Sequence, residues 1–467
     1  MKFYEIGAYA MSFRAILAIL VCKALRFISR VLRRGGTAMP GRVALRICPT
    51  LLARLARGVK TVAITGTNGK TTSARMVEQA FMEQGKSYFA NRSGANLISG
   101  ITTEFVINST LAGKCRKEYA VIECDEAAAR TVFGQLRPQV VVVTNLFRDQ
   151  LDRFGEVTHT LENIREAVAG APEAVLCLNA DCSLTASLAD DLKNPVVFFG
   201  VNKGAAPSRP KPEISDATHC LRCKAEYDYD YVTYGHLGGF RCPRCGYSRR
   251  SPDYAVTDIS SQRADGSTVV MDIRGESRVV EINLPAMYNI YNAADAVAAV
   301  SEMGLGSDAA IAALADFKCG FGRMESFQLG KAGARMMLVK NPAGCNQVIE
   351  FLRQVKEPFV LVICLNDRSA DGTDVSWIWD ADFEGLALLG GRLAHTVVSG
   401  DRAADMAVRV KYAGLPQERV SVQRSYEKLV EWMAEQETPV FVMPTYTAML
   451  ELREAVIRHC GGDEFWV

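Results

Sequence analysis

The chain lacks a large net charge of either sign. Its 54 basic and 52 acidic residues give a formal charge of +2 over 467 residues. So small a net charge excludes a general electrostatic attraction to nucleic acid or to an anionic membrane, and any polyanion would have to be recognised locally. The length is sufficient for two to four domains.

A secretory signal is also lacking, although the chain has 14 cysteines. In an extracellular protein so many cysteines would indicate disulfides, whereas in a reducing cytosol thiols stay free or bind metal. We therefore expect a cytoplasmic protein.

The N-terminal region lacks an apolar run long enough to cross a bilayer. Between Arg14 and Lys23 it has eight apolar residues, whereas a span needs about 20. Helical spacing places a group of apolar residues on one side: Ile16, Ile19, Leu20, Leu25 and Ile28. We expect this helix to pack on the protein body. A helix lying on the inner face of the membrane is the alternative.

The residues VKTVAITGTNGKTT, from Val59 to Thr72, place a short apolar strand before a glycine-bearing turn that ends in Lys-Thr-Thr. Ile64 stands where the usual phosphate-loop pattern has its first glycine. Backbone N–H groups in such a turn converge on phosphate oxygens, lysine adds charge, and a hydroxyl reaches Mg²⁺. The sequence therefore predicts ATP and Mg²⁺ binding by Gly66, Thr67, Asn68, Gly69, Lys70, Thr71 and Thr72.

From Val59 onward apolar, β-rich runs alternate with helical patterns, which predicts an α/β fold with a parallel sheet covered on both faces. The pattern includes a helix from Cys182 to Leu192. Two glycines near Met324 mark a second boundary, after which the α/β rhythm restarts. We predict an N-terminal helical segment at 1–55, a central ATPase domain at 56–320 and a Rossmann-like C-terminal domain at 321–467.

Four cysteines form two C-x2-C pairs separated by 18 residues: Cys220, Cys223, Cys242 and Cys245. This spacing predicts a zinc ribbon inserted at about 213–250, with a closed, structural Zn²⁺ site. Basic and aromatic residues around the pairs also suit nucleic acid. Nearby acidic residues weaken that alternative, and we expect no nucleic-acid partner.

Several further segments carry polar or charged residues that follow predicted strands or glycines. They are Glu123 in VIECDEAA, Asp149 and Asp152 in TNLFRDQLDRFG, Asn289 and Asn292 in LPAMYNIYN, and Arg323 and Glu325 in GRME. Together with GTNGKTT, this set resembles the Mur ligase family, which joins amino acids to peptidoglycan precursors through an acyl phosphate. The resemblance implies a Mur-ligase-like ATPase domain followed by a smaller α/β domain.

Two departures make the chain most similar to the MurT subfamily. About 58 residues precede the phosphate loop, which is short for a domain that binds a UDP-linked precursor, and a ribbon interrupts the ATPase domain. Two further segments are also similar to that subfamily, namely KNPAGCN from Lys340 and LNDRSADGTDVSWIWDADFE from Leu365. The resemblance implies ATP-dependent amidation of the D-isoglutamate α-carboxylate of lipid II, with ammonia from a GatD-like glutamine amidotransferase in a heterodimer.

The same resemblance assigns residue roles. Lys70 and Glu123 would act on the transferring phosphoryl group, with Thr71 and Glu123 on Mg²⁺, and Asn289, Asn292 and Arg323 would position the nucleotide. Gln150 stands where many Mur ligases have a histidine, so their complete magnesium shell does not transfer.

Asp374 has two interpretations. By resemblance it completes the Cys-His pair of the glutaminase across the subunit interface, as the third member of a triad. By local pattern it caps the next helical turn, after a turn at Asp371-Gly372. Two other functions stay open: a Mur or folylpolyglutamate-type ligase that adds an amino acid, and a zinc-ribbon NTPase that binds nucleic acid.

Overall fold

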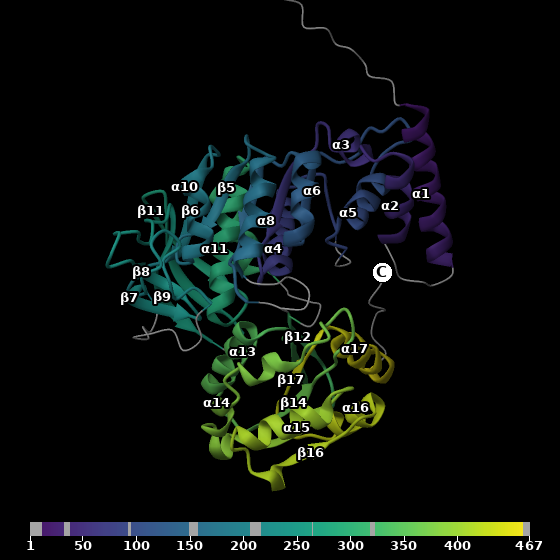
Figure 1. The fold of residues 1–467 in the computed structure, drawn as a ribbon. Helices are drawn as coiled ribbons and strands as arrows, with labels where there is room; N and C mark the ends of the chain where they lie inside the picture. The colour runs from purple at the N-terminus through teal and green to yellow at the C-terminus, as the bar shows by residue number, and fades with distance from the viewer. Residues whose placement is uncertain are drawn as a thin grey trace, which may run out of the picture.

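The computed structural model describes residues 12–31, 38–91, 95–148, 157–205, 216–263, 265–317 and 323–460. Figure 1 shows two α/β parts, a larger one from the first two thirds of the chain and a smaller one below it from the last third. Each part is built around its own sheet.

The larger sheet is mixed rather than fully parallel. Its order is β11-β10-β9-β6-β5-β4-β1-β3-β2, and the seven strands from β9 to β2 are parallel, whereas β10 is antiparallel to both its neighbours. The strands are β1 (Lys60–Thr65), β2 (Tyr88–Ala90), β3 (Tyr119–Glu123), β4 (Val140–Val143), β5 (Val175–Asn179), β6 (Val196–Val201), β9 (Tyr254–Gln262), β10 (Ser267–Ile273) and β11 (Glu276–Ile282). Central strands β3 and β4 are buried along their whole length, as expected of strands covered on both faces.

Helices cover this sheet in two packed groups: α4 contacts α11 and α12, and α6 contacts α8. The helices are α4 (Lys70–Glu83), α6 (Glu126–Leu136), α8 (Val157–Ala169), α9 (Ser183–Ala186), α10 (Leu188–Asp191), α11 (Met287–Glu302) and α12 (Ser307–Ala315). The single helix predicted from Cys182 to Leu192 is wrong, because this segment forms the two short helices α9 and α10. Side chains there bond back to the main chain: Thr185 Oγ1 donates to Asn179 O and Ser187 Oγ donates to Leu184 O, which competes with helical pairing.

The N-terminal region forms α1 (Phe13–Val31), α2 (Ala38–Ile47) and α3 (Leu51–Leu55), which pack with α5 (Ile98–Ile107). α1 packs on the protein body as predicted, but the predicted face is only partly right. Ile19 is buried as expected, whereas Leu20 and Ile28 are exposed and Ala15, Ala18 and Cys22 are buried in their place. Small side chains let two helix backbones approach closely, so they face α2 and α5. Among the described helices, none is long and apolar enough to cross a membrane.

The smaller sheet has the order β12-β13-β17-β14-β15-β16, parallel except for β12. Its strands are β12 (Arg323–Phe327), β13 (Ala334–Met337), β14 (Phe359–Cys364), β15 (Leu393–Ser399), β16 (Val420–Val422) and β17 (Val440–Pro444). The helices are α13 (Pro342–Gln354), α14 (Glu384–Ala387), α15 (Ala403–Tyr412), α16 (Tyr426–Ala434) and α17 (Tyr446–Cys460). In Figure 1 the α13 end of this part faces the larger one.

A hairpin of β7 (Asp228–Tyr234) and β8 (Leu237–Arg241) forms a third, two-stranded sheet. It belongs to the insertion between β6 and β9. The domain bounds predicted from the sequence stay a prediction, and the boundary glycine Gly320 lies outside the described residues.

Candidate active site

The predicted phosphate loop lies between β1 and α4, at the carboxyl end of a central strand. Gly66 and Gly69 have φ of +119° and +92°, a region that side chains other than glycine rarely adopt. A Cβ at Gly66 would clash with Thr144 Oγ1, and one at Gly69 would clash with Asn292 Oδ1. Both glycines are therefore required by conformation and by space.

Lys70, the first residue of α4, folds back over this loop. Its Nζ donates to Gly66 O at 2.5 Å and forms a buried ion pair with Glu126 Oε1 at 2.9 Å. Burial acts to lower the pKa of Lys70, but the carboxylates of Glu126, Glu123 and Asp125 outweigh burial and raise that pKa above its ordinary value. The ammonium is therefore charged and already placed at the loop.

The two predicted magnesium ligands lie together at the ends of β3 and the loop. Thr71 Oγ1 donates to Glu123 Oε2 at 2.8 Å. Asn91 holds the Glu123 backbone, because its Oδ1 accepts from Glu123 N at 2.9 Å and its Nδ2 donates to Glu123 O at 2.7 Å. A hydroxyl and a carboxylate are hard oxygen ligands, so this pair fits Mg²⁺.

The segment that follows β4 fixes the loop from the other side. Asn145 Oδ1 accepts from Asn68 N at 3.0 Å, and Thr144 Oγ1 donates to Asn68 O at 2.7 Å. Phe147 N donates to Thr67 Oγ1 at 3.0 Å. The protein's own hydrogen bonds thus fix the conformation of the loop, which reduces the conformational cost of binding a phosphate chain.

A pocket beside the loop is closed by residues of both parts of the chain. The larger part contributes Asn68, Gly69, Thr72, Asn145, Tyr234, Tyr288 and Asn292, and the smaller part contributes Met324, Met337, Leu338, Lys340, Ala343, Gly344, Gln347 and Val348. Across the two parts Asn341 Nδ2 donates to Asn68 Oδ1 at 3.0 Å. Apolar walls and a few amides next to a phosphate loop suit a nucleotide base.

Of the other predicted nucleotide residues, Asn292 lines this pocket and Asn289 is bonded to it. Asn289 Oδ1 accepts from Asn292 Nδ2 at 3.3 Å, and Asn289 Nδ2 donates to Pro285 O at 2.6 Å. Arg323 is the first residue of β12, next to the pocket residue Met324, and its side chain lies outside the described part.

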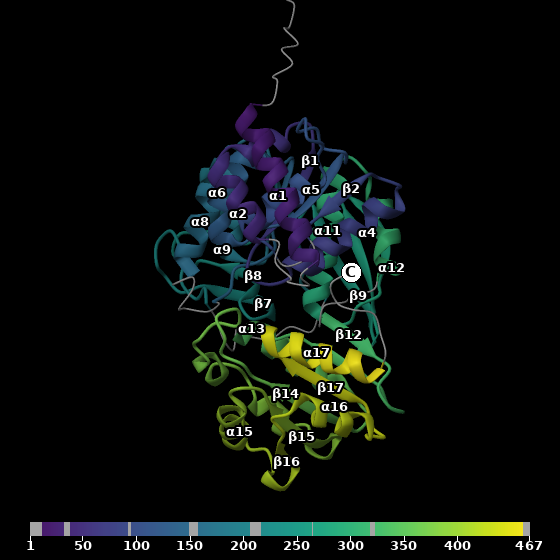
Figure 2. The same cartoon turned by 90° about the vertical axis from the view of Figure 1, so that its right-hand side faces the viewer.

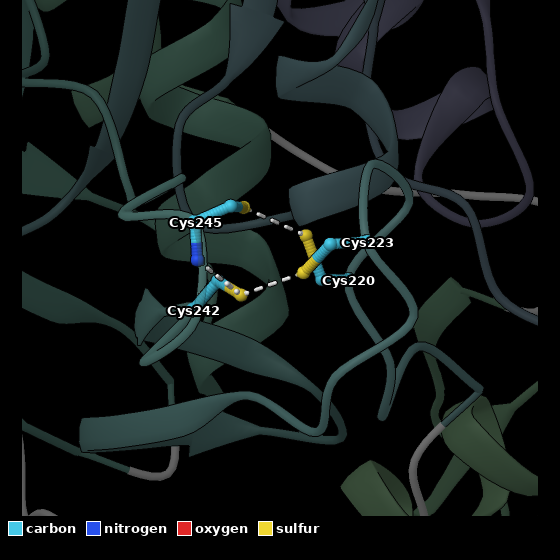
Figure 3. Close-up of side chains that lie close together, drawn as sticks. All are labelled: Cys220, Cys223, Cys242 and Cys245. Carbon is cyan, nitrogen blue, oxygen red and sulfur yellow. Dashed lines mark hydrogen bonds between the residues drawn. The ribbon is translucent and has the colours of Figure 1, made fainter.

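The four cysteines of the insertion converge (Figure 3). The Sγ atoms of Cys220 and Cys245 are 3.5 Å apart, those of Cys223 and Cys242 are 3.4 Å apart, and all four lie within 4.8 Å of one another. In a tetrahedral zinc–thiolate site with bonds of about 2.3 Å, the sulfurs lie about 3.8 Å apart. The donor set and its spacing therefore fit one metal ion.

The backbone around the two pairs repeats the same turn. Lys224 N donates to Cys220 O at 2.8 Å and Gly246 N donates to Cys242 O at 3.0 Å, and both Lys224 and Gly246 have positive φ, at 63° and 74°. Two equivalent knuckles thus present the four sulfurs.

Of the five aromatic residues considered for nucleic acid, four lie inside the protein and Tyr229 is partly exposed. Tyr227, Tyr231, Tyr234 and Phe240 are each at most 6% exposed, and Tyr227 and Phe240 pack against Tyr247 with tilted rings in a small core. Rings buried in this way cannot stack on bases without unfolding the insertion.

The insertion is joined to the nucleotide side of the molecule through Asp181, which is fully buried after β5. Arg249, just beyond the second knuckle, pairs with Asp181 Oδ1 at 2.5 Å. Tyr291 of α11 donates its hydroxyl to Asp181 Oδ2 at 2.5 Å, and Val201 N donates to the same atom at 2.7 Å. The helix that carries Asn289 and Asn292 is therefore tied to the insertion by one carboxylate.

Comparisons with known proteins cover nearly the whole chain. The Mur ligase middle domain family matches residues 64–230, and the MurT ligase C-terminal family matches residues 338–449. The chain is 34% identical over 445 residues to the Streptococcus pneumoniae protein named lipid II isoglutaminyl synthase (glutamine-hydrolyzing) subunit MurT, covering 95% of this chain and 97% of that one. The chain belongs to the MurT family. The Staphylococcus aureus MurT subunit (strain COL) is 31% identical, with 96% and 99% of the two chains covered.

The fold agrees with that assignment. A pseudomurein peptide ligase type C from Methanothermus fervidus has a TM-score of 0.63 at 19% identity, over 86% of this chain and 79% of that chain. This likeness concerns the fold alone, and together with the match to the Mur ligase middle domain it supports a Mur-ligase-like α/β fold.

The MurT C-terminal match includes Asp374, in the loop after β14. Asp374 Oδ1 accepts from Ser376 N at 2.8 Å. It therefore binds the first N–H of the short 3₁₀ helix Ser376–Trp379, although the N-cap position of that helix is Val375. The preceding turn has Gly372 at φ +87°, and the buried carboxylate of Asp371 accepts from Thr447 N at 2.7 Å. The loop is thus anchored on α17 and presents Asp374, half-buried, beside a surface depression.

The far end of this loop reaches the larger part of the molecule. Arg148 Nη1, three residues after Asn145, lies 3.8 Å from Asp380 Oδ2, and both side chains are about half exposed. The neighbouring Asp149, Gln150 and Asp152, singled out from the sequence, lie outside the described residues.

Sequence reasoning missed several site residues. Asn91 carries no motif signal. Glu126 and Asn341 lie within the segments VIECDEAA and KNPAGCN, but neither is singled out there. Glu325 has a structural partner instead of a ligand, because Arg453 Nε of α17 lies 2.9 Å from its Oε1.

Proposed function

We propose that this protein uses ATP to amidate the D-isoglutamate α-carboxylate of lipid II, with ammonia supplied by a glutaminase subunit. The observation that carries the proposal is the near-full-length similarity to the named MurT subunits, combined with a preformed phosphate loop. The mixed apolar and amide pocket beside that loop supports ATP as the nucleotide.

The chain's own side chains suit phosphoryl transfer to a carboxylate. Lys70, charged and aimed at the loop, would neutralise charge on the transferring group, and Thr71 and Glu123 would hold Mg²⁺. Bound Mg²⁺, held by these two residues, would supply further neutralisation of the phosphate charge. Asn289, Asn292 and Arg323 would position the nucleotide.

The proposed chemistry balances in two steps. A carboxylate oxygen attacks the γ-phosphorus, ADP leaves, and an acyl phosphate remains. Ammonia then attacks the acyl carbon, phosphate leaves with the bonding electron pair, and the nitrogen loses a proton to give the amide. Activation is needed because a free carboxylate is a poor electrophile.

We propose that Asp374 takes part in glutamine hydrolysis by the partner subunit. A cap on Ser376 uses one carboxylate oxygen, so the same side chain can orient an imidazole presented by a GatD-like glutamine amidotransferase. The depression beside it, lined by Val375, Trp379 and Val408, is the proposed docking place of that subunit. The complex would be a heterodimer in the cytoplasm.

We assign Zn²⁺ to Cys220, Cys223, Cys242 and Cys245, as a zinc ribbon with a structural role. Four thiolates fill a tetrahedral shell, so the ion would have no open position for water. Purified protein should contain one Zn²⁺ per chain, and Cys220→Ser should lose both the metal and the packing of the insertion. A chain that folds with full nucleotide affinity and no metal would contradict this assignment.

The function is tested by co-expressing the chain with a GatD-like glutaminase and incubating the complex with lipid II, ATP, Mg²⁺ and glutamine. The product should be lighter by the difference between a hydroxyl and an amino group in mass spectrometry, with one phosphate released per product. Phosphate release without this product would refute the proposal.

A second function is favoured by the match to the Mur ligase middle domain, namely addition of an amino acid. The same assay with glutamine replaced by single amino acids separates the two functions, because each ligase gives a product of different mass.

A further inference from the structure

Helix α1 has two apolar faces. One is the buried face of small residues that packs on α2 and α5. The other points away from the protein, and we call it the α1 stripe: Phe13, Leu17, Leu20, Phe27, Ile28 and Val31, with exposed fractions from 39% to 80%.

The α1 stripe is continuous along the helix. Its members follow one another at intervals of three, four or seven residues, apart from the adjacent pair Phe27 and Ile28, and this spacing repeats one helical face. The stripe runs over 19 residues, about 27 Å of helix. In Figures 1 and 2 α1 lies at the edge of the molecule, with its outer side uncovered by any drawn element. Six exposed large apolar side chains in one row are unusual for a surface that faces only water.

The N-terminal segment carries charge of one sign, and the adjacent α5 adds one acidic residue, Glu104, near Cys22. Residues 12–60 contain 11 of the chain's 54 basic residues and none of its 52 acidic ones, so the remainder of the chain is net acidic. Arg14 and Arg30 are exposed on α1, and Arg42 and Arg46 are exposed on the adjacent α2. Although the net charge of the whole chain is small, its N-terminal segment, residues 12–60, is strongly basic.

We propose that α1 docks this protein on the surface of an anionic lipid bilayer. Apolar side chains in one row with basic residues beside them are the features of a helix that lies in the plane of a membrane interface. Arg14, Lys23, Arg26 and Arg30 interrupt the helix too often for it to span a bilayer, in agreement with the absence of a spanning helix among the described residues.

A bilayer fits this surface better than a second copy of the chain does. Two copies meeting through their stripes would bring two basic edges together, and like charges would oppose the contact. Anionic headgroups would instead pair with the arginines while the stripe enters the acyl boundary. The proposal rests on the proposed function in one respect, because a lipid-linked substrate would be reached from the same surface.

The test uses the full chain, with its partner subunit, in sedimentation with vesicles of phosphatidylcholine alone or mixed with an equal amount of phosphatidylglycerol. We expect binding to the anionic vesicles. Phe13→Ser/Phe27→Ser should weaken it by roughly tenfold for each phenylalanine. Arg14→Gln/Arg30→Gln should weaken it by roughly fivefold for each charge lost.

Matched controls are Val279→Ser, which removes a side chain of similar exposure from β11, and Arg424→Gln, which removes an exposed arginine before α16. Both should bind vesicles like the unchanged protein. ATP binding by every variant reports whether the fold is intact.

Two results would overturn the proposal. One is equal vesicle binding by the stripe variants and the controls. The other is a change in oligomeric state by light scattering without any vesicle binding, which would assign the stripe to a protein contact. Amidation of lipid II dissolved in detergent separates the hypotheses: stripe variants should retain it, and its absence in the unchanged complex would count against the proposed function instead.

Discussion

The buried ion pair between Arg249 and Asp181 gives a sharp prediction about how the insertion is held. Replacing Arg249 by methionine keeps much of the side-chain volume but leaves the Asp181 carboxylate, fully buried, without its cation. Removing one partner of a buried pair costs about 3–5 kcal/mol, because the remaining charge stays in a low-dielectric interior. We expect a loss of this size in the free energy of unfolding of the larger part.

The next residue provides the control. Arg250 pairs with Asp190 at 2.9 Å, but its own side chain is 46% exposed. Exposed pairs contribute at most about 1 kcal/mol, so Arg250→Gln should have little effect. The double change Asp181→Leu/Arg249→Met removes both charges and should recover part of the loss.

The assay must follow the larger part of the chain. All four tryptophans lie after residue 376, so their fluorescence reports on the smaller part. Unfolding in urea should therefore be measured by the rate of proteolysis at sites in the larger part. Equal losses in Arg249→Met and Arg250→Gln, or a loss below about 1 kcal/mol in both, would refute the reasoning.

The remaining predictions concern catalysis and pH. Lys70→Ala should lower amidation by about a thousandfold while the fold persists, because a charge aimed at the transferring phosphoryl group is lost; near-normal turnover would count against its role. Glu123→Gln should raise the Mg²⁺ concentration needed for half-maximal rate by at least about tenfold, and an unchanged requirement would exclude it as a ligand. Asp374→Asn preserves a cap oxygen but should lower glutamine-driven product by about a hundredfold or more and spare ammonia-driven product; equal loss from both nitrogen sources would exclude the triad role. Burial lowers the pKa of His236 to about 4, below its usual 6.5. The native state therefore keeps it neutral while the unfolded chain gains a proton, so stability should be full above pH 6.5 and fall by up to about 3 kcal/mol toward pH 4; His236→Leu should weaken this dependence in unfolding measured against pH, and an identical profile would contradict the assignment.

Local sequence was sufficient for most central elements. The apolar runs Thr61–Ile64 and Val140–Val143 predict two strands. The structure has β4 at Val140–Val143, and its β1 extends the first of these runs by one residue at each end. Short apolar runs bounded by glycine or polar residues specify such strands without help from distant parts of the chain. The contact between Thr71 and Glu123 could also be anticipated, since both follow parallel strands at the same sheet edge.

Contacts between distant segments could not be predicted in this way. Asn341 meets Asn68 across 273 residues, and Asp181, Arg249 and Tyr291 converge from three separate segments. Each is a single polar residue whose partner is set by the packing of the two parts. The prediction of the buried face of α1 was inaccurate for another reason. It was based on the large apolar residues, whereas close helix packing buries Ala15, Ala18 and Cys22.

The contact between Arg148 and Asp380 connects two events that the proposed reaction keeps apart. Arg148 follows the strand segment that grips the phosphate loop, and Asp380 ends the loop that presents Asp374. An exposed pair of this kind is weak. Its consequence is positional: the segment that fixes the phosphate loop and the loop that carries Asp374 meet directly, although they belong to different parts of the molecule.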